Sequence, residues 1–256
     1  MKTVLSQDQL DQYERDGIAF PIRILSTSEA SAYREEIDSI IRNFPEGSLK
    51  RLDSLHLFFE WAHRLVNHDV LLNAIEDILG HDLLVDGTLV FYKPPQDSSY
   101  VSWHQDSVYS GWHLTPSTSA WIALTASYSG NGCMRVIPGS HEQGQLSHVN
   151  IPDESNLVRR GERVETVDES AAVDVVLQPG EMSLHQSTIV HGSNPNASDE
   201  PRIGFIVRFV TNKIVNPKRP LLRVRGKADC SHLALAQLHI ERDEQTAISA
   251  WRAFSG

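Results

Sequence analysis

Two residues of the sequence, His104 and Asp106, are separated by one position and carry side chains that commonly bind metal ions. If this segment forms a strand, residues two apart point to the same face, so the imidazole and the carboxylate would aim at one spot. Farther along the chain, His191 offers a third ligand. Two histidines and one carboxylate on one side of a metal, with the other positions open, are typical of non-haem Fe(II) oxygenases. The spacing therefore predicts a metal centre with positions left for small ligands.

Spacing alone does not choose the third ligand, because His141, His185 and His191 all lie in or next to the expected β region. His185 and His191 could lie on neighbouring strands that face the same interior. Arg202 favours His191, because a guanidinium can bind a carboxylate through two parallel hydrogen bonds and would suit a dicarboxylate cosubstrate. Ser193 could donate a further hydrogen bond to that carboxylate. We therefore expect the metal and cosubstrate sites to form on one hairpin.

The strands that would position these residues are predicted from short apolar runs that begin at residue 83. The expected strands cover residues 83–92, 120–126, 134–137, 173–177 and 203–210, and proline and glycine pairs separate them. We expect these strands to close a barrel or sandwich with helices packed outside. Residues 142–172 are polar and poorly periodic, which is typical of a lid or a binding loop. Within them, Arg159, Arg160 and Arg163 could contact an anionic group of a substrate.

Residues 1–82 are expected to be mainly helical. Ser6 with Gln9, and Ser26 with Glu29, have the capping-box form that opens helices. Each predicted helix would satisfy its first backbone N–H groups through these side chains.

A further helix is expected from Asn67, as its cap, to Gly80, as its terminator. Residues 211–256 read as a tail that holds a last helix over 231–254. The tail residues expected to pack on the rest of the protein are Leu233, Leu235, Leu238 and Trp251. Since no repeat or linker-like composition interrupts residues 1–256, we expect one domain.

Composition excludes several classes of protein. The net charge of −10 over 256 residues argues against a nucleic-acid partner, because phosphates need a basic face. No run of about 18 apolar residues is present to span a membrane. The acidic start is unlike a signal peptide, and two cysteines do not suggest a disulfide framework, so we expect a cytoplasmic protein. Its oligomeric state, monomer or homodimer, is not indicated.

Four motifs together resemble the phytanoyl-CoA dioxygenase family. They are His104-Gln105-Asp106, Ala-Trp-Ile-Ala-Leu-Thr at 120–125, Gly-Cys-Met-Arg-Val-Ile-Pro-Gly-Ser-His at 132–141, and His191-Gly192-Ser193 with Arg202. The resemblance spans residues 83–210. It implies a mainly β protein whose core is a double-stranded β-helix, or jelly roll, that binds Fe(II) and 2-oxoglutarate.

The resemblance also implies a role for individual residues. The implied iron ligands are His104, Asp106 and His191. The 2-oxoglutarate carboxylate that lies far from the metal would be held by Arg202 and Ser193, with Trp121 near it. Family halogenases have a small residue in place of the carboxylate ligand, so Asp106 points to hydroxylation or a related oxidation.

The resemblance therefore implies an oxygenase that couples 2-oxoglutarate and O2 to the oxidation of a C–H bond, releasing succinate and CO2. The substrate is expected to be a small polar molecule, which could be anionic or a specialised metabolite. Tyr109, Trp112 and His113 follow the His104–Asp106 pair and could line the mouth of its pocket.

Two other interpretations remain open from the sequence. One is a jelly-roll protein that binds a metal without oxidising anything. The other is a zinc-dependent hydrolase whose three protein ligands leave a position for water. The hydrolase interpretation gives Arg202 no role.

Overall fold

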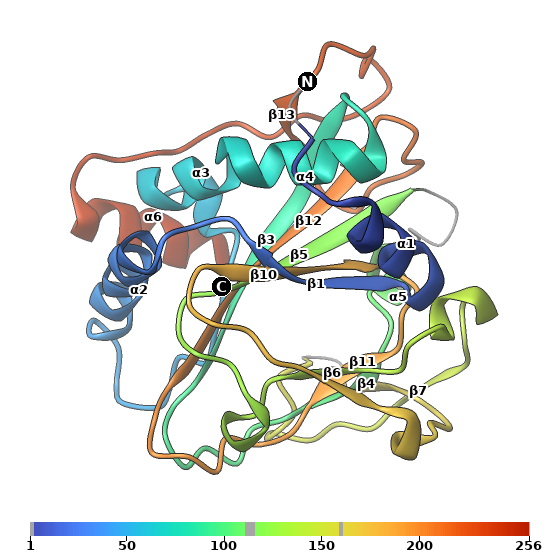
Figure 1. Cartoon of the computed structure of the whole chain (residues 1–256). Helices are drawn as coiled ribbons and strands as arrows, with labels where there is room; N and C mark the ends of the chain where they lie inside the picture. The colour runs from blue at the N-terminus through green and yellow to red at the C-terminus, as the bar shows by residue number, and fades with distance from the viewer. Residues whose placement is uncertain (1–2, 111–115, 159–160, 256) are drawn as a thin grey trace.

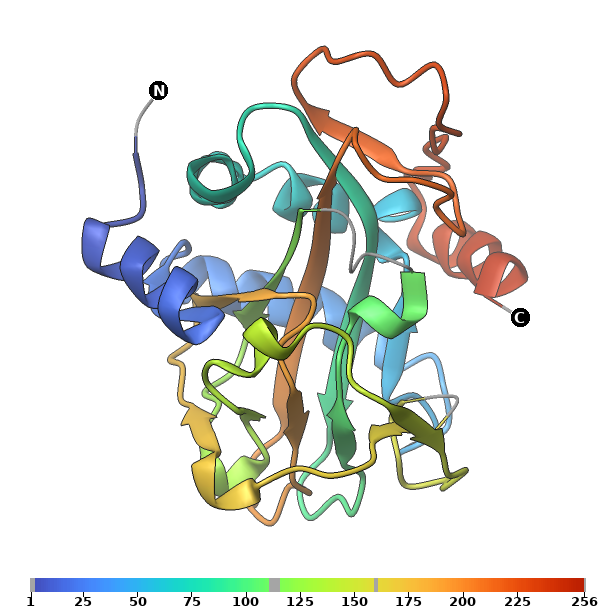
Figure 2. The same cartoon turned by 90° about the vertical axis from the view of Figure 1, so that its right-hand side faces the viewer.

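The computed structural model describes residues 3–110, 116–158 and 161–255, and its centre is a sandwich of two antiparallel sheets (Figures 1 and 2). The larger sheet has the order β1 (Ile18–Arg23), β10 (Glu181–Gln186), β5 (Ser117–Ala123), β12 (Arg202–Thr211), β3 (Leu83–Lys93), β13 (Leu222–Arg225), and β2 (Arg51–Asp53) also pairs with β3. The smaller sheet has the order β4 (Val101–His104), β11 (His191–Ser193), β6 (Met134–Val136), β9 (Val173–Val175). The predicted mainly β architecture is confirmed.

Helices cover the face of the larger sheet that points away from the smaller one (Figure 1). They are α1 (Gln7–Asp16), α2 (Thr27–Ile41), α3 (Glu60–Val66), α4 (Asp69–Leu79) and α6 (Glu244–Ser255). Shorter helical turns are η1 (Leu55–Leu57), α5 (Ser107–Ser110), η3 (Ser129–Asn131), η4 (Ser140–Gln143) and η5 (Glu169–Ala171). Both predicted capping boxes are present at the starts of α1 and α2. In the described part of the chain, no helix is long and apolar enough to cross a membrane.

Strand β12 shows how the two sides of the larger sheet differ. Phe205 and Phe209 belong to the core between this sheet and the helices. Ile206 belongs to a second core, which lies between the two sheets. Because side chains alternate along a strand, Arg202 and Arg208 fall on the same inner face as Ile206. This face therefore carries two arginines into the space between the sheets.

The N-terminal region differs from its prediction in two ways. It contributes β1 and β2 to the larger sheet, in addition to the expected helices. Asn67 ends α3 instead of opening α4, and its amide donates back to the carbonyl oxygen of His63 at 2.9 Å. His68 is the residue that precedes the first turn of α4.

The later segments are also more detailed than predicted. The expected lid, residues 142–172, contains a hairpin of β7 (His148–Asn150) and β8 (Glu162–Val164). In the tail, the helix begins only at Glu244, and the side chains of Leu235 and Leu238 are exposed. These two leucines therefore do not pack as expected, whereas Trp251 is buried.

Candidate functional site

The predicted metal-binding residues come together between the two sheets. His104 ends β4 and is the direct cross-strand partner of His191 in β11, and the centroids of the two rings are 4.2 Å apart. The potential ligand atoms of His104, Asp106 and His191 all lie within 4.8 Å of one another, and all three residues are buried. Two imidazoles and a carboxylate in this arrangement could hold a metal ion.

Backbone carbonyls orient both imidazole rings. The Nδ1 atom of His104 lies 2.8 Å from the carbonyl oxygen of Ser102, and that of His191 lies 3.1 Å from the carbonyl oxygen of Ile189. Because a carbonyl only accepts, each Nδ1 donates, and each Nε2 keeps a lone pair for a metal. Burial lowers the pKa of His104, and it holds the pKa of His191 well below its usual value. Both rings are therefore neutral, as metal ligation requires.

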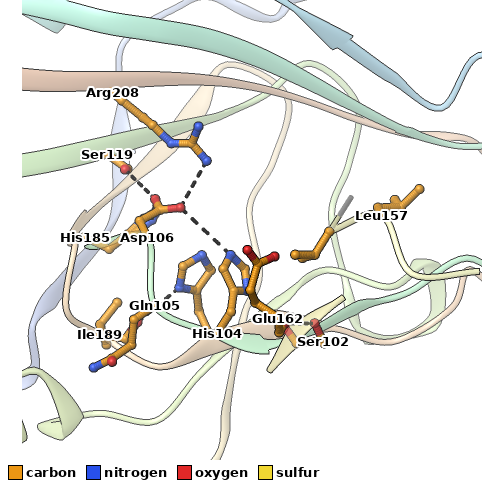
Figure 3. Close-up of polar contacts among 12 residues, drawn as sticks. Ser102, His104, Gln105, Asp106, Ser119, Leu157, Glu162, His185, Ile189 and Arg208 are labelled. Atoms are coloured by element: carbon orange, nitrogen blue, oxygen red, sulfur yellow. Dashed lines mark hydrogen bonds and ion pairs between the residues drawn. The ribbon is translucent and has the colours of Figure 1, made fainter. Parts of the chain in front are cut away.

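The carboxylate of Asp106 is held by the opposite sheet (Figure 3). Arg208 donates from Nη2 to Oδ1 at 3.0 Å, and Ser119 donates from Oγ to Oδ2 at 2.9 Å. Because β4 ends at His104, Asp106 lies beyond the strand. Arg208 and Ser119 therefore direct its side chain, and the alternation of side chains along a strand that we expected does not. Burial acts to raise the pKa of Asp106, but the guanidinium of Arg208, together with His185, outweighs it and holds that pKa well below the usual value.

The other two candidate histidines lie outside this group of three. His185, in β10, places Nε2 3.7 Å from Oδ2 of Asp106, so it supports the carboxylate from the side of the larger sheet. His141 belongs to η4 and contacts the end of α1, where its Nε2 is 3.0 Å from the carbonyl oxygen of Glu14. Among the three alternatives, the geometry therefore favours His191 as the metal ligand.

This difference leads to a testable prediction. Replacing His191 with glutamine is expected to weaken Fe(II) binding by at least about 10³-fold, because a ligand is lost. Replacing His185 with glutamine is expected to weaken it only about 10-fold, because this residue orients a ligand. Equilibrium dialysis under anaerobic conditions measures both affinities. The assignment is wrong if the His185 variant loses the metal and the His191 variant retains it.

Arg202 provides a second polar group in the same interior. It is 1% exposed, and its Nε and Nη2 atoms donate to the carbonyl oxygen of Gly132 at 3.1 and 2.5 Å. Its guanidinium lies 5.2 Å from the ring centroid of Trp121. Gly204 gives the indole its space, because a Cβ added there would lie 2.1 Å from Trp121 Cζ2. The Nη1 atom of Arg202 is buried without a hydrogen-bond partner in the described part of the protein.

The expectation that one hairpin builds the whole site is wrong. Strand β11, with His191 and Ser193, belongs to the smaller sheet, whereas β12, with Arg202, belongs to the larger one. The site therefore depends on the packing of one sheet against the other.

Lys93 is a site residue that the sequence prediction missed. It is fully buried at the end of β3, directly across from Arg202 in β12. Its Nζ donates to Oγ of Ser193 at 2.7 Å and also to the carbonyl oxygen of Asn194. Burial, with Arg202 nearby, lowers the pKa of Lys93 to about 6. The sequence signal was a lysine at an inward-facing position near the end of a mostly apolar strand.

A lysine that is buried without a paired carboxylate lowers the stability of the protein, because it gives up its proton on folding at pH 7. We therefore expect Lys93→Met to raise the free energy of unfolding by about 1–3 kcal/mol at pH 7 without small ligands. The unfolded lysine keeps its proton up to about pH 10, while the folded one loses it near pH 6, so wild-type stability rises between these values. The difference in the free energy of unfolding between Lys93→Met and wild type should therefore become smaller from pH 6 to pH 10.

Denaturant unfolding across this pH range measures the effect. Lys213→Met is the matched control, because Lys213 is exposed and its replacement should leave stability almost unchanged. A Lys93→Met variant that is less stable than wild type at pH 7 would contradict the prediction.

Apart from Lys93, these groups line one cavity of about 500 Å³. Its inner lining residues include His104, Asp106, His191, Ser193, Arg202, Trp121, Leu89 and Ile206. Of the predicted substrate contacts, Trp112 and His113 lie outside the described residues, and Tyr109 is described only as part of the backbone of α5. Of the lid arginines, Arg159 and Arg160 also lie outside them, and Arg163 lines a different cavity, beside Trp103.

The fold and this set of residues are typical of jelly-roll oxygenases of the non-haem iron type. The chain matches the phytanoyl-CoA dioxygenase (PhyH) family over residues 13–204 and belongs to that family. The predicted resemblance and the jelly-roll fold are therefore confirmed.

Individual relatives agree with this membership. The ectoine dioxygenase of Halomonas elongata is 27% identical, with 83% of this chain and 73% of that protein covered. A probable alpha-ketoglutarate-dependent hypophosphite dioxygenase of Stutzerimonas stutzeri is also 27% identical, with 63% and 57% covered. The structure of the non-heme monooxygenase ThoJ superposes with a TM-score of 0.78 at 31% identity, with 95% and 93% covered.

Proposed function

We propose that the protein is an Fe(II)- and 2-oxoglutarate-dependent dioxygenase that hydroxylates, or otherwise oxidises, a C–H bond of a small organic molecule. The observation that carries the proposal is the buried Nη1 of Arg202, which lacks a hydrogen-bond partner among the described residues and shares a cavity with the His104, Asp106 and His191 group. A buried, unsatisfied guanidinium donor is costly unless an acceptor binds there. A carboxylate of 2-oxoglutarate would satisfy it.

Each group of the site would have a defined task. His104, Asp106 and His191 would hold Fe(II) from one side, and the carbonyls behind the two rings would fix their orientation. Arg202 and Ser193 would bind the far carboxylate of 2-oxoglutarate, with Lys93 as an additional donor. When bound, iron and 2-oxoglutarate supply the oxidation of the substrate by O2 together with release of succinate and CO2.

Two features favour this function over its alternatives. Asp106 is present and well ordered by Arg208 and Ser119, which supports hydroxylation or a related oxidation rather than halogenation. Arg202, which lines the same cavity as the candidate metal ligands, and Lys93, which donates to Ser193, would have no role in a zinc hydrolase. Relatives named as dioxygenases of ectoine and of hypophosphite support a small-molecule substrate.

An anaerobic titration tests the proposal. Fe(II) and 2-oxoglutarate added to the metal-free protein should give a weak visible charge-transfer band, and air should then convert 2-oxoglutarate to succinate. Protein that binds iron but gives neither the band nor succinate would instead be a binding module. Metal analysis of anaerobically purified protein separates iron from zinc.

A further inference from the structure

The mouth of the cavity is basic although the whole chain is acidic. The segment Pro217-Lys218-Arg219-Pro220 lies in the connection from β12 to β13, and both of its basic residues line the cavity. Histidines aside, the described lining has five basic residues, Arg51, Arg202, Arg208, Lys218 and Arg219, and two acidic ones, Asp53 and Asp106. The chain as a whole has a net charge of −10. The excess of positive charge is therefore local to this cavity.

Four of these five basic residues already have a task or a partner. Arg51 is paired with Asp53 at 3.0 Å, and Arg208 with Asp106 at 3.0 Å. Arg202 faces the position proposed for 2-oxoglutarate. Arg219 is paired with Asp86 through Nε at 3.6 Å, whereas within the described part of the chain no carboxylate lies within ion-pair distance of Lys218. A ligand at the mouth would meet these two cations.

The side chain of Arg219 lies next to two features of β3. Its Nε lies 3.6 Å from Oδ2 of Asp86, a buried residue at an irregularity in the pairing of β3 with β12. A Cβ at the next residue, Gly87, would come within 3.2 Å of Arg219 Nη1, so glycine leaves room for the guanidinium to lie against the strand. Among the described residues, Arg219 pairs with Asp86 through Nε, and neither of its Nη atoms takes part in that pair. The two terminal nitrogens can therefore bind a ligand.

Arg219 and the candidate metal centre lie along the same pair of strands, β3 and β12. Gly87, against which Arg219 lies, is the cross-strand partner of Arg208, and Arg208 holds Asp106. A molecule that contacts both Arg219 and the candidate metal centre would therefore lie along the β3–β12 strand pair. Leu89 and Ile206 line this cavity and give it apolar walls. Phe254 of α6 also borders it.

We propose that Lys218 and Arg219 bind an oxyanion of the substrate, a carboxylate or a phosphate-type group, and that an apolar body of the same molecule extends toward the metal. The inference rests on the proposed function, since it assumes that iron and 2-oxoglutarate occupy the inner end of the cavity. Guanidinium and ammonium groups at a cavity mouth bind oxyanions by charge-assisted hydrogen bonds. The substrate class is therefore a small organic anion.

Fluorine NMR with a matched pair of probes tests this substrate class. 4-Fluorophenylacetate and its neutral amide are titrated anaerobically into protein that carries Fe(II) and one equivalent of 2-oxoglutarate. We expect the acid to bind at least about 10-fold more tightly than the amide, because only the acid forms charge-assisted hydrogen bonds. The K218Q/R219Q double variant should bind the acid as weakly as the amide. K213Q removes an exposed charge of the same connection and should retain the preference.

Equal binding of acid and amide, no binding of the acid, or acid binding unchanged in K218Q/R219Q would each overturn the inference. The charge-transfer band recorded on the same samples separates this result from the proposed function. A normal band without acid preference overturns only the oxyanion subsite. Acid preference without a band overturns the proposed cofactors and supports the subsite.

Discussion

Asp106→Ala is expected to abolish succinate formation from 2-oxoglutarate, by at least about 10³-fold, and to destabilise the protein by about 3 kcal/mol. The loss of turnover follows from the loss of the candidate carboxylate ligand. The loss of stability has a different cause, because Arg208 would remain largely buried without the carboxylate that accepts its hydrogen bond at 3.0 Å. Succinate assays and denaturant unfolding measure the two effects on the same preparation.

A second variant separates ligation from folding. Asp106→Ala combined with Arg208→Met removes both members of the buried pair, and we expect most of the lost stability to return while turnover stays absent. Recovery of turnover in the double variant would show that Asp106 serves only to neutralise Arg208. Substantial succinate formation in folded Asp106→Ala protein would likewise overturn its assignment as a metal ligand.

Arg202→Met is expected to raise the KM for 2-oxoglutarate about 10²-fold, with a smaller change in kcat. A charge-assisted hydrogen bond from Nη1 to a carboxylate contributes up to about 3 kcal/mol, which corresponds to that factor. Arg202 already donates from Nε and Nη2 to the carbonyl oxygen of Gly132, which fixes its guanidinium at the wall of the cavity, and its Nη1 has no hydrogen-bond partner among the described residues. A lysine in its place would lack this fork, and we expect Arg202→Lys to restore affinity only in part.

Ser193→Ala is the matched comparison, because it removes one neutral donor beside the same carboxylate. We expect a rise in the KM for 2-oxoglutarate of about 10-fold or less. Steady-state kinetics with varied 2-oxoglutarate, together with titration of the charge-transfer band, measure both variants. An unchanged KM in Arg202→Met would remove the main support for 2-oxoglutarate as cosubstrate.

Local sequence signals predicted those features that depend on neighbouring residues. The capping boxes at Ser6 and Ser26 open helices because each hydrogen-bond partner lies three residues away. Turn residues and apolar runs located most of the long strands, although their ends shifted by a few residues. Asn67 shows the limit of such signals, because an asparagine can end one helix as well as open the next.

The sequence by itself determined the class of chemistry. His104 and Asp106, the motifs around them and Arg202 predicted a family that the comparisons confirm. Only the tertiary structure decided which residues complete the site. Strand register pairs His191 with His104, and sheet packing brings Arg208 to Asp106, Lys93 to Ser193 and Arg219 to the cavity mouth. These contacts join residues far apart in the chain, so they depend on how the sheets pair and pack, which no local pattern encodes.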